Sequence, residues 1–333
     1  MRNSVVKFSI SLLPYTTGFI SRENLRTTTA GRGKSKRVVQ SFVEDSPLID
    51  AHHHFWELGR FNTTWLEDPK LSAIHRTFLP DDLVPHLRAC GVRATVFVQT
   101  QHNLEEARWV MEMAQTRPWL VGVVGWIDLS AGAACETTVL ELKQSPLFVG
   151  VRHIVHDELD DDWIVREEVI EGLKVLEKYD VPFDLLFYPR HLKHVGELVR
   201  RLPHLRMVID HVAKPSIRSG QWADWRADLK QAASFPTVFC KLSGMVTEAA
   251  WDSWKPSDLK RYADTAFEAF GPSRIMFGSD WPVCELAGSY ERVVDAAAQL
   301  TQGFSESERK SVFESSAIHF YRLDASSLPA EAS

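Results

Sequence analysis

Hydrophobic and polar positions after Glu44 follow a regular alternation along the chain. Short apolar runs rich in β-branched residues are followed by longer segments in which apolar residues recur at helical spacing. Most of the short runs are continuous rather than alternating, which is typical of parallel strands buried on both faces. The pattern predicts eight strands, at Leu48–His52, Ala94–Gln101, Leu120–Ile127, Phe148–Ile154, Pro182–Phe187, Arg206–Ile209, Thr237–Leu242 and Arg274–Phe277.

The segments between these runs carry the start and stop signals of helices. Capping residues or a proline precede three predicted helices, over Leu83–Cys90, Leu104–Thr116 and Asp258–Phe270. Gly91 and Gly271 follow the first and the last of them, as C-terminal stops should. Strands that alternate with helices in this way indicate an α/β fold with a parallel sheet. Eight such units in about 280 residues fit a single-domain, TIM-like (β/α)8 barrel better than an open, doubly wound sheet.

The charge of the chain divides it into two parts. Residues 1–44 hold 8 Lys and Arg against 2 acidic residues, a net charge of +6, which leaves 30 basic and 42 acidic residues, a net charge of −12, for the remainder. We expect a disordered basic extension over residues 1–44, a barrel over residues 45–325 with an insertion at Gly59–Thr77, and a flexible tail over residues 326–333. The extension is rich in Ser, Thr and Arg, as mitochondrial presequences are. We therefore expect a mitochondrial protein if the extension acts as a presequence, and a cytoplasmic one otherwise.

Composition argues against several classes of function. No stretch approaches the roughly 18 apolar residues of a membrane span, and the acidic body offers no electrostatic footprint for nucleic acid. The four cysteines lack the spacing of a zinc finger or of a disulfide framework. No glycine-rich phosphate loop follows the first strand, so we expect no nucleotide cofactor. The sequence thus favours a barrel that acts on small molecules.

Three polar signals lie at the ends of predicted strands, where the loops of a barrel form its active site. His52 and His54 stand two residues apart on the first run, so their side chains point to the same face and could share a divalent metal. His211 follows the sixth run and Asp280 the eighth. Alone, each signal has an ordinary explanation as a solvated turn, a core histidine or a helix cap. Because all of them fall at the same end of different strands, we expect them to converge on one site.

Other residues near that end are candidates for binding a substrate. Arg152 could grip a carboxylate or hydroxyls through its rigid fork of donors, or form a structural salt bridge. Lys214 and Lys241 could donate to substrate oxygens, although an ion-paired lysine is the commoner outcome. Trp56 and Trp281 could form aromatic walls for a sugar ring, or pack at the rim. The substrate-binding candidates are Arg152, Trp56, Lys214, Trp281 and His153.

Five stretches of the chain carry a resemblance to a known family. They are Asp50–Trp56, Gly150–His153, Asp210–Pro215, Cys240–Gly244 and Gly278–Pro282. The chain resembles the amidohydrolase superfamily, whose barrels carry an HxH pair after strand 1, a histidine after strand 6 and an aspartate after strand 8. The closer match is to the amidohydrolase-related group that contains L-fuconolactonase, L-rhamnonolactonase and 2-pyrone-4,6-dicarboxylate lactonase. It covers nearly the whole predicted barrel.

This resemblance implies a hydrolase that opens the ester ring of a sugar-derived lactone, with Asp280 and His211 as catalytic residues. It also implies one divalent metal, zinc, on His52, His54 and Asp280. The fifth run contains no histidine, and the fourth carries Arg152 rather than the bridging Lys or Glu of two-metal members, so a two-metal centre lacks ligands. Some lactonases of the group are thought to work without a tightly held metal. We therefore expect either one zinc ion or an enzyme that works without zinc.

The substrate and two other functions stay open. We expect an aldonolactone such as L-fuconolactone or L-rhamnonolactone, because an acidic body with few arginines suits a dicarboxylated pyrone poorly. A zinc-dependent nonoxidative decarboxylase would use similar ligands, although it is expected to need the missing histidine of strand 5. A catalytically silent, ligand-binding barrel is the least favoured alternative, because the histidines and the aspartate are all retained. A homodimer is a further expectation.

Overall fold

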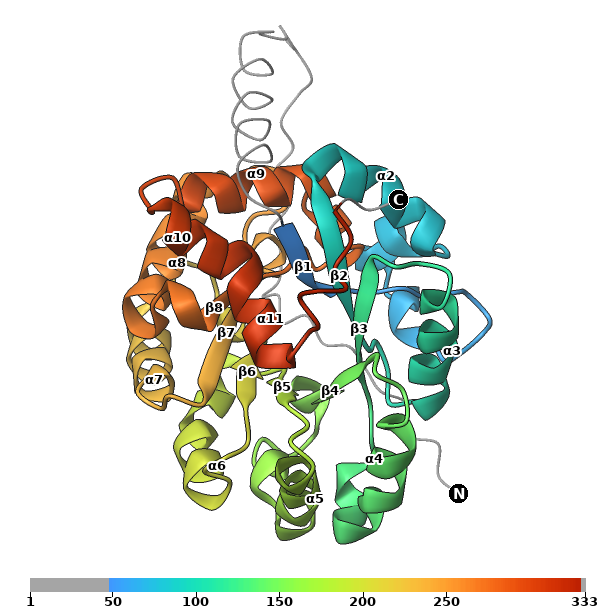
Figure 1. Ribbon diagram of the computed structural model, residues 1–333. Coiled ribbons are helices and arrows are strands. Elements are labelled where there is room, and N and C mark those ends of the chain that lie inside the picture. Colours follow the sequence, from blue (N-terminus) through green and yellow to red (C-terminus); the bar gives the residue numbers. More distant parts are fainter. Residues whose placement is uncertain (1–47, 331–333) are drawn as a thin grey trace, which may run out of the picture.

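The computed structural model describes residues 48–330. At its centre is a sheet of eight parallel strands in the order β1 to β8, each hydrogen-bonded to the next (Figure 1). All eight predicted strands are confirmed as parts of a (β/α)8 barrel. The strands are β1 (Leu48–His53), β2 (Val92–Val98), β3 (Leu120–Gly125), β4 (Phe148–His153), β5 (Phe183–Leu185), β6 (Met207–Ile209), β7 (Val238–Leu242) and β8 (Ile275–Phe277).

The loop after β8 closes the barrel against β1. The Asp280 N–H donates to the His52 carbonyl at 2.8 Å, and the His54 N–H donates to the Trp281 carbonyl at 2.7 Å. His53 and Trp281 form a parallel bridge between these two bonds. The backbone bonds that close the barrel therefore also place Asp280 beside the histidines of β1.

A ring of helices surrounds the strands (Figure 1). Prolines begin α2 and α8, and Gly91 ends α2 in the left-handed conformation at φ 63°, as the sequence predicted. The predicted helices are confirmed, except that α3 ends at Ala114 rather than at Thr116. The helices are α2 (Pro80–Cys90), α3 (Leu104–Ala114), α4 (Glu136–Leu142), α5 (Glu167–Lys178), α6 (Val195–Arg201), α7 (Ala223–Ala233), α8 (Pro256–Phe270), α9 (Tyr290–Leu300), α10 (Glu306–Lys310) and α11 (Ser316–Tyr321).

The last helix, α11, seals the amino-terminal end of the barrel. Figure 1 shows it across the middle of the ring of strands. Its Phe320 and Tyr321 pack inside the barrel against apolar residues of the strands, among them Val96, Val208 and Met276. A second, larger apolar core lies between the strands and the surrounding helices. Because apolar side chains close one end of the barrel, the polar chemistry is confined to its interior and to the opposite, carboxyl end.

The remaining segments have separate outcomes. The insertion at Gly59–Thr77 contains two short 3-10 helices, η1 (Thr64–Glu67) and η2 (Pro69–Ile74). The basic extension over residues 1–44 lies outside the described residues, and it stays a prediction. Of the predicted tail, residues 326–330 are described and form neither helix nor strand. Within residues 48–330, no helix is long and apolar enough to cross a membrane.

Candidate active site

Four side chains gather at the carboxyl end of the barrel, from the end of β1 and from the loops after β6 and β8. The Asp280 Oδ1 atom lies 3.2 Å from His54 Nε2 and 3.7 Å from His52 Nε2. His211 Nε2 lies 3.9 Å from the same oxygen. All four side chains are buried. The residues that the sequence singled out for catalysis or metal binding therefore form one cluster.

The backbone that carries His211 is strained. Four consecutive non-glycine residues, His211 to Lys214, have φ between 49° and 58°, and Asp280 has φ 58°. The left-handed conformation costs an L-residue about 1–2 kcal/mol, and such strain concentrates at functional sites. The Trp225 Nε1–H donates to the Val212 carbonyl at 2.8 Å and helps to hold this turn. The turn directs His211 toward Asp280.

Two glycines leave room for the histidines. A Cβ on Gly244, which has φ +59°, would lie 2.4 Å from His211 Nδ1. A Cβ on Gly278 would lie 2.5 Å from His52 Cβ. Both distances are shorter than any real contact of this kind, so a side chain at either glycine would displace the imidazole beside it. Glycines in two of the five family-like stretches thus have a physical reason in the site.

The hydrogen bonds of His54 indicate that a cation belongs in the cluster. His54 Nδ1 lies 2.7 Å from the Val98 carbonyl, which can only accept, so Nδ1 carries a proton. Burial lowers the pKa of His54, although Asp280 opposes this shift, and in the neutral ring Nε2 presents a lone pair. That lone pair faces the Asp280 carboxylate oxygen at 3.2 Å. Two acceptors at this distance require a proton or a metal ion between them.

The donor set fits a divalent metal such as zinc. Nitrogen and oxygen atoms of His52, His54 and Asp280 lie within 4.8 Å of one another. A tetrahedral ion with bonds of about 2.0–2.2 Å separates its ligands by about 3.4 Å, close to the distances found here. These three residues would hold the ion. The Val98 carbonyl would orient His54 in the manner usual for metal-binding histidines.

The charges around the site favour an ionised Asp280 beside neutral imidazoles. Burial lowers the pKa of His211 to about 4. Burial would raise the pKa of Asp280, but the neighbouring His211, His54 and His52 outweigh it and keep the pKa below its usual value. The carboxylate is therefore ionised at neutral pH and can accept a proton.

Sequence reasoning missed Asp50 as a residue that shapes the site. Its Oδ1 accepts from the His52 N–H at 3.1 Å and from the Ser279 N–H at 2.8 Å. Its Oδ2 accepts from the Tyr290 hydroxyl at 3.0 Å. Burial raises the pKa of Asp50 to about 6. Asp50 therefore fastens β1 to the loop that carries Asp280, and its place at the start of the family-like stretch Asp50–Trp56 was the signal for it in the sequence.

Arg152 lies in the interior and forms a salt bridge. Its Nη1 donates to Asp210 Oδ2 at 3.2 Å and lies 3.3 Å from His52 Nε2, and its Nη2 donates to the Gln99 carbonyl. Burial raises the pKa of Asp210, but Lys241, His52 and Arg152 outweigh it and hold the pKa well below its usual value. The salt bridge that was one alternative for Arg152 is therefore present, and its contact with a substrate stays a prediction.

His153 is enclosed by other rings. Its ring centroid lies 4.0 Å from that of His102 and 3.9 Å from that of Trp163. Trp126 Nε1 donates to His153 Nδ1 at 3.2 Å, so His153 Nε2 carries the proton and donates to Glu158 Oε1 at 2.7 Å. Although His102, His153 and Glu158 bring donor atoms close together, both His153 nitrogens are engaged. This second group therefore suits a metal poorly.

The two tryptophans pack among other aromatic rings. The Trp281 ring lies 5.4 Å from that of Phe78, and its Nε1 donates to Glu285 Oε1 at 2.9 Å. The Trp56 ring lies 5.3 Å from the same Phe78 ring. Both indoles are almost fully buried. The packing alternative is what the structure shows, and a sugar contact by either indole stays a prediction.

Lys214 keeps partial access to solvent. Its Nζ lies 3.1 Å from Glu248 Oε1, with the two side chains 16% and 20% exposed. Burial would lower the pKa of Lys214, but Glu248, Tyr188 and Asp280 outweigh it and raise the pKa. Lys214 is therefore a charged group near Asp280 that also has an acceptor beside it.

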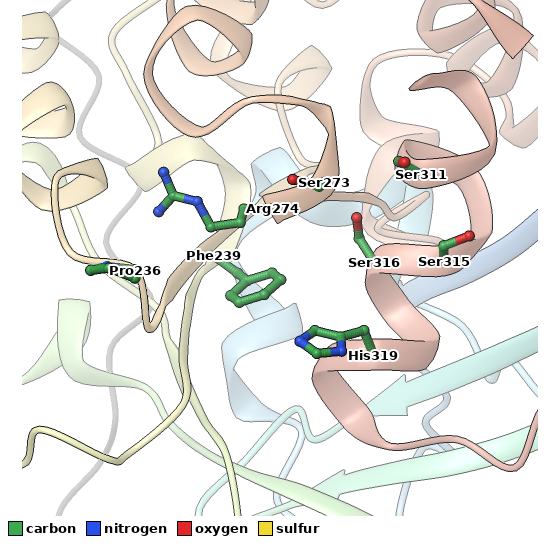
Figure 2. Close-up of a pocket in the computed structure, with 8 residues that line it drawn as sticks. All are labelled: Pro236, Phe239, Ser273, Arg274, Ser311, Ser315, Ser316 and His319. Atoms are coloured by element: carbon green, nitrogen blue, oxygen red, sulfur yellow. The ribbon is translucent and has the colours of Figure 1, made fainter. Parts of the chain in front are cut away.

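A cavity of about 400 Å³ lies at the other end of the barrel (Figure 2). There Phe239, at the start of β7, and His319 of α11 have ring centroids 6.0 Å apart. The lining contains no carboxylate and only one imidazole, so it offers no constellation for hydrolysis. The lining residues are Pro236, Phe239, Ser273, Arg274, Ser311, Ser315, Ser316 and His319.

Comparisons with known proteins assign this chain to a family. The sequence model of the amidohydrolase family matches residues 49–323. The chain is 38% identical over 283 residues to an L-fucono-1,5-lactonase of Burkholderia ambifaria, covering 83% of this chain and 96% of that protein. It is 35% identical over 286 residues to an L-fucono-1,5-lactonase of Burkholderia multivorans, with the same coverage of both. A crystal structure of an amidohydrolase from Burkholderia multivorans with bound zinc has a TM-score of 0.78 at 33% identity, over 84% of this chain and 100% of that chain.

The chain belongs to the amidohydrolase family. It is an enzyme of the hydrolase class, which sets aside the catalytically silent barrel. A 2,6-dihydroxybenzoate decarboxylase from Rhizobium has a TM-score of 0.56, but at 14% identity the likeness shows the fold alone. The decarboxylase alternative therefore gains no support beyond the shared barrel.

Proposed function

We propose that this enzyme hydrolyses a sugar lactone, with L-fucono-1,5-lactone as its main substrate. The observation that carries the proposal is the Asp280 carboxylate held within 3.9 Å of three imidazole nitrogens at the open end of the barrel. The names of the two relatives at 38% and 35% identity support this choice of lactone. L-Rhamnonolactone is the second candidate, since an L-rhamnono-gamma-lactonase of Scheffersomyces stipitis is 22% identical over 58% of the chain.

Asp280 and His211 would perform the reaction. Asp280 takes a proton from a water molecule, whose oxygen attacks the lactone carbonyl carbon. His211 donates a hydrogen bond to the oxygen that becomes negative in the tetrahedral intermediate. The ring C–O bond then breaks, and Asp280 returns the proton to the leaving alkoxide. The products are the open-chain aldonic acid and a restored Asp280 carboxylate.

A divalent metal, zinc, would be held by His52, His54 and Asp280. Two observations support this metal. The Burkholderia multivorans amidohydrolase has bound zinc, and His54 Nε2 lies 3.2 Å from Asp280 Oδ1. When bound, such an ion lowers the pKa of its water toward about 7 and polarises the carbonyl. Asp50 keeps His52 in place through its backbone N–H in either case.

Lys214 is the substrate-binding residue that the geometry favours. Its ammonium and the Glu248 carboxylate form a donor and an acceptor 3.1 Å apart, both partly exposed, which suits neighbouring hydroxyls of a sugar. Arg152, His153, Trp56 and Trp281 would contribute to the same pocket mainly by supporting it, because all four are buried against other groups.

A panel of lactones tests the proposal. Purified enzyme is assayed with a pH indicator against L-fucono-1,5-lactone, L-rhamnonolactone, D-galactonolactone and 2-pyrone-4,6-dicarboxylate, with a chelator and with added zinc. We expect the highest kcat/KM for L-fucono-1,5-lactone. The proposal would be overturned if the enzyme hydrolyses none of these lactones, or if it instead releases carbon dioxide from an aromatic acid.

Targeting by the basic extension is a separate proposal. We expect residues 1–44 to direct a fused fluorescent protein to mitochondria, because their composition is that of a presequence. The bacterial relatives give this proposal no support. A cytosolic fusion would leave the extension as a plain tail. The homodimer also stays a prediction, which sedimentation analysis tests.

A further inference from the structure

A lysine ammonium occupies the barrel interior on the inner side of His52. Lys241 Nζ lies 2.6 Å from Asp184 Oδ2 and 3.1 Å from Asp210 Oδ1. It also lies 3.1 Å from His52 Nδ1. The side chain is 0% exposed, so it cannot reach a substrate at the rim. The ion-paired alternative for Lys241 is therefore the one that the structure shows.

Two partners of this ammonium, His52 and Asp210, belong to a group that could bind a divalent metal. Their donor atoms and one of His211 lie within 4.8 Å of one another, as do those of His52, His54 and Asp280. Imidazole nitrogens and carboxylate oxygens are zinc ligands in both groups. The two groups share His52, whose Nε2 faces the outer one and whose Nδ1 faces the inner one. The inner group therefore could take a metal ion if it were empty of other cations.

The interior also has unused acceptor capacity. Asp184 Oδ1 is buried and has no hydrogen-bond partner within residues 48–330. Its Oδ2 accepts from the Tyr321 hydroxyl of α11 at 2.8 Å as well as from Lys241. A buried carboxylate with an unpaired oxygen is costly unless a cation compensates it. Lys241 provides that cation.

Among the described residues, Lys241 and Arg152 are the two cations that contact the buried carboxylates Asp184 and Asp210. Loss of the ammonium leaves Asp184 without the cation 2.6 Å from it and Asp210 with Arg152 as its cation, in a space closed by α11. A buried charge of this kind takes up a proton or a cation. The vacated space lies beside His52 and Asp210 of the inner group and would add the Asp184 carboxylate as a further ligand.

We propose that Lys241 is a built-in cation that fills the inner ligand group and thereby limits the barrel to one divalent ion, at the outer group of His52, His54 and Asp280. The inference rests on the metal-binding part of the proposed function. The missing histidine of strand 5 is one reason to expect a single metal ion. Lys241 gives a second reason, because the inner group has ligands but already holds a positive charge.

Zinc content of a lysine variant tests this inference. Wild type, Lys241→Ala and the control Lys230→Ala are loaded with zinc, desalted and analysed by mass spectrometry for zinc per chain, and their Tm values are measured with and without zinc. Lys230 on α7 is a matched control, because it forms an ion pair with Glu268 at 2.8 Å on the surface. The intact chain is used throughout.

We expect Lys241→Ala to bind one zinc ion more than wild type and to gain more in Tm on zinc addition, while Lys230→Ala behaves as wild type. Folding of Lys241→Ala only in the presence of zinc would also support the inference. Equal zinc content in wild type and folded Lys241→Ala would overturn it. If the variant does not fold at all, the wild-type content decides: one ion supports the inference, and no ion or two ions overturn it. Lactone hydrolysis is assayed in parallel, so a failure of the proposed function would appear there without changing the zinc content.

Discussion

The substitution Gly244→Ala tests whether the position of His211 determines the rate. The new methyl carbon would lie 2.4 Å from Nδ1, 2.6 Å from Cγ and 3.0 Å from Cβ of His211. Ordinary contacts between such atoms are about 3.5–4.0 Å, so the imidazole must move by about 1 Å. A displacement of this size can lower a rate by about 100-fold. The Ser243 hydroxyl, 2.9 Å from His211 Nδ1, would lose its hydrogen bond as well.

A second glycine separates this effect from the cost of the backbone. Gly59 has φ +83°, and an added methyl carbon there would meet nothing within 4 Å, whereas Gly244 has φ +59° and the clash. Both substitutions place alanine in the left-handed region, at about 1–2 kcal/mol each. We expect Gly59→Ala to lower stability to chemical denaturation by that amount and to keep wild-type kcat/KM for L-fucono-1,5-lactone. Gly244→Ala should lose about 100-fold in kcat/KM. Wild-type activity in Gly244→Ala would refute the requirement for a fixed His211.

Three further predictions concern stability. Burial lowers the folded-state pKa of His53 to about 3, whereas the pKa in the unfolded chain is about 6.5. Below pH 6.5 the unfolded chain therefore binds a proton that the folded chain does not, and the free energy of unfolding falls as the pH drops. His53 alone should cost about 2 kcal/mol between pH 6.5 and 5, measured by urea unfolding, and a pH-independent unfolding free energy would contradict this. Arg152→Met should lower the unfolding free energy by about 3–5 kcal/mol, because the buried carboxylates of Asp184 and Asp210 then share the single ammonium of Lys241. A loss below about 1 kcal/mol would show that the pair is not buried as described. Removal of metal with dipicolinate should lower Tm, and zinc should restore it, whereas an unchanged Tm would count against a bound ion.

The strands of the barrel could be predicted from the sequence because both of their faces are buried. A continuous apolar run such as Met207–Ile209 has no other stable place in a fold of this kind. The ends of the strands are less predictable. Residues at the rim no longer form the hydrogen bonds of the sheet, but they remain buried and apolar, so the sequence pattern continues past the strand. The fifth strand covers only Phe183–Leu185, although the apolar run extends from Pro182 to Phe187.

The site could be predicted as far as parallel strands impose it. His52, His54, His211 and Asp280 meet because the carboxyl ends of parallel strands share one rim. Residues whose role depends on how far inside the barrel they lie, or on an unusual backbone conformation, could not be found in this way. Lys241 points into the interior rather than to the rim, and the left-handed turn after Ile209 follows from tertiary contacts rather than from any local preference.

The most direct test of the account is the activity of Asp280→Asn. The substitution keeps the shape of the side chain and removes the base that lies 3.2 Å from His54 and 3.9 Å from His211. We predict that kcat/KM for L-fucono-1,5-lactone falls by about 100- to 10,000-fold while the protein stays folded by circular dichroism. A folded Asp280→Asn enzyme with kcat/KM within tenfold of wild type would contradict the claim that this carboxylate performs the hydrolysis.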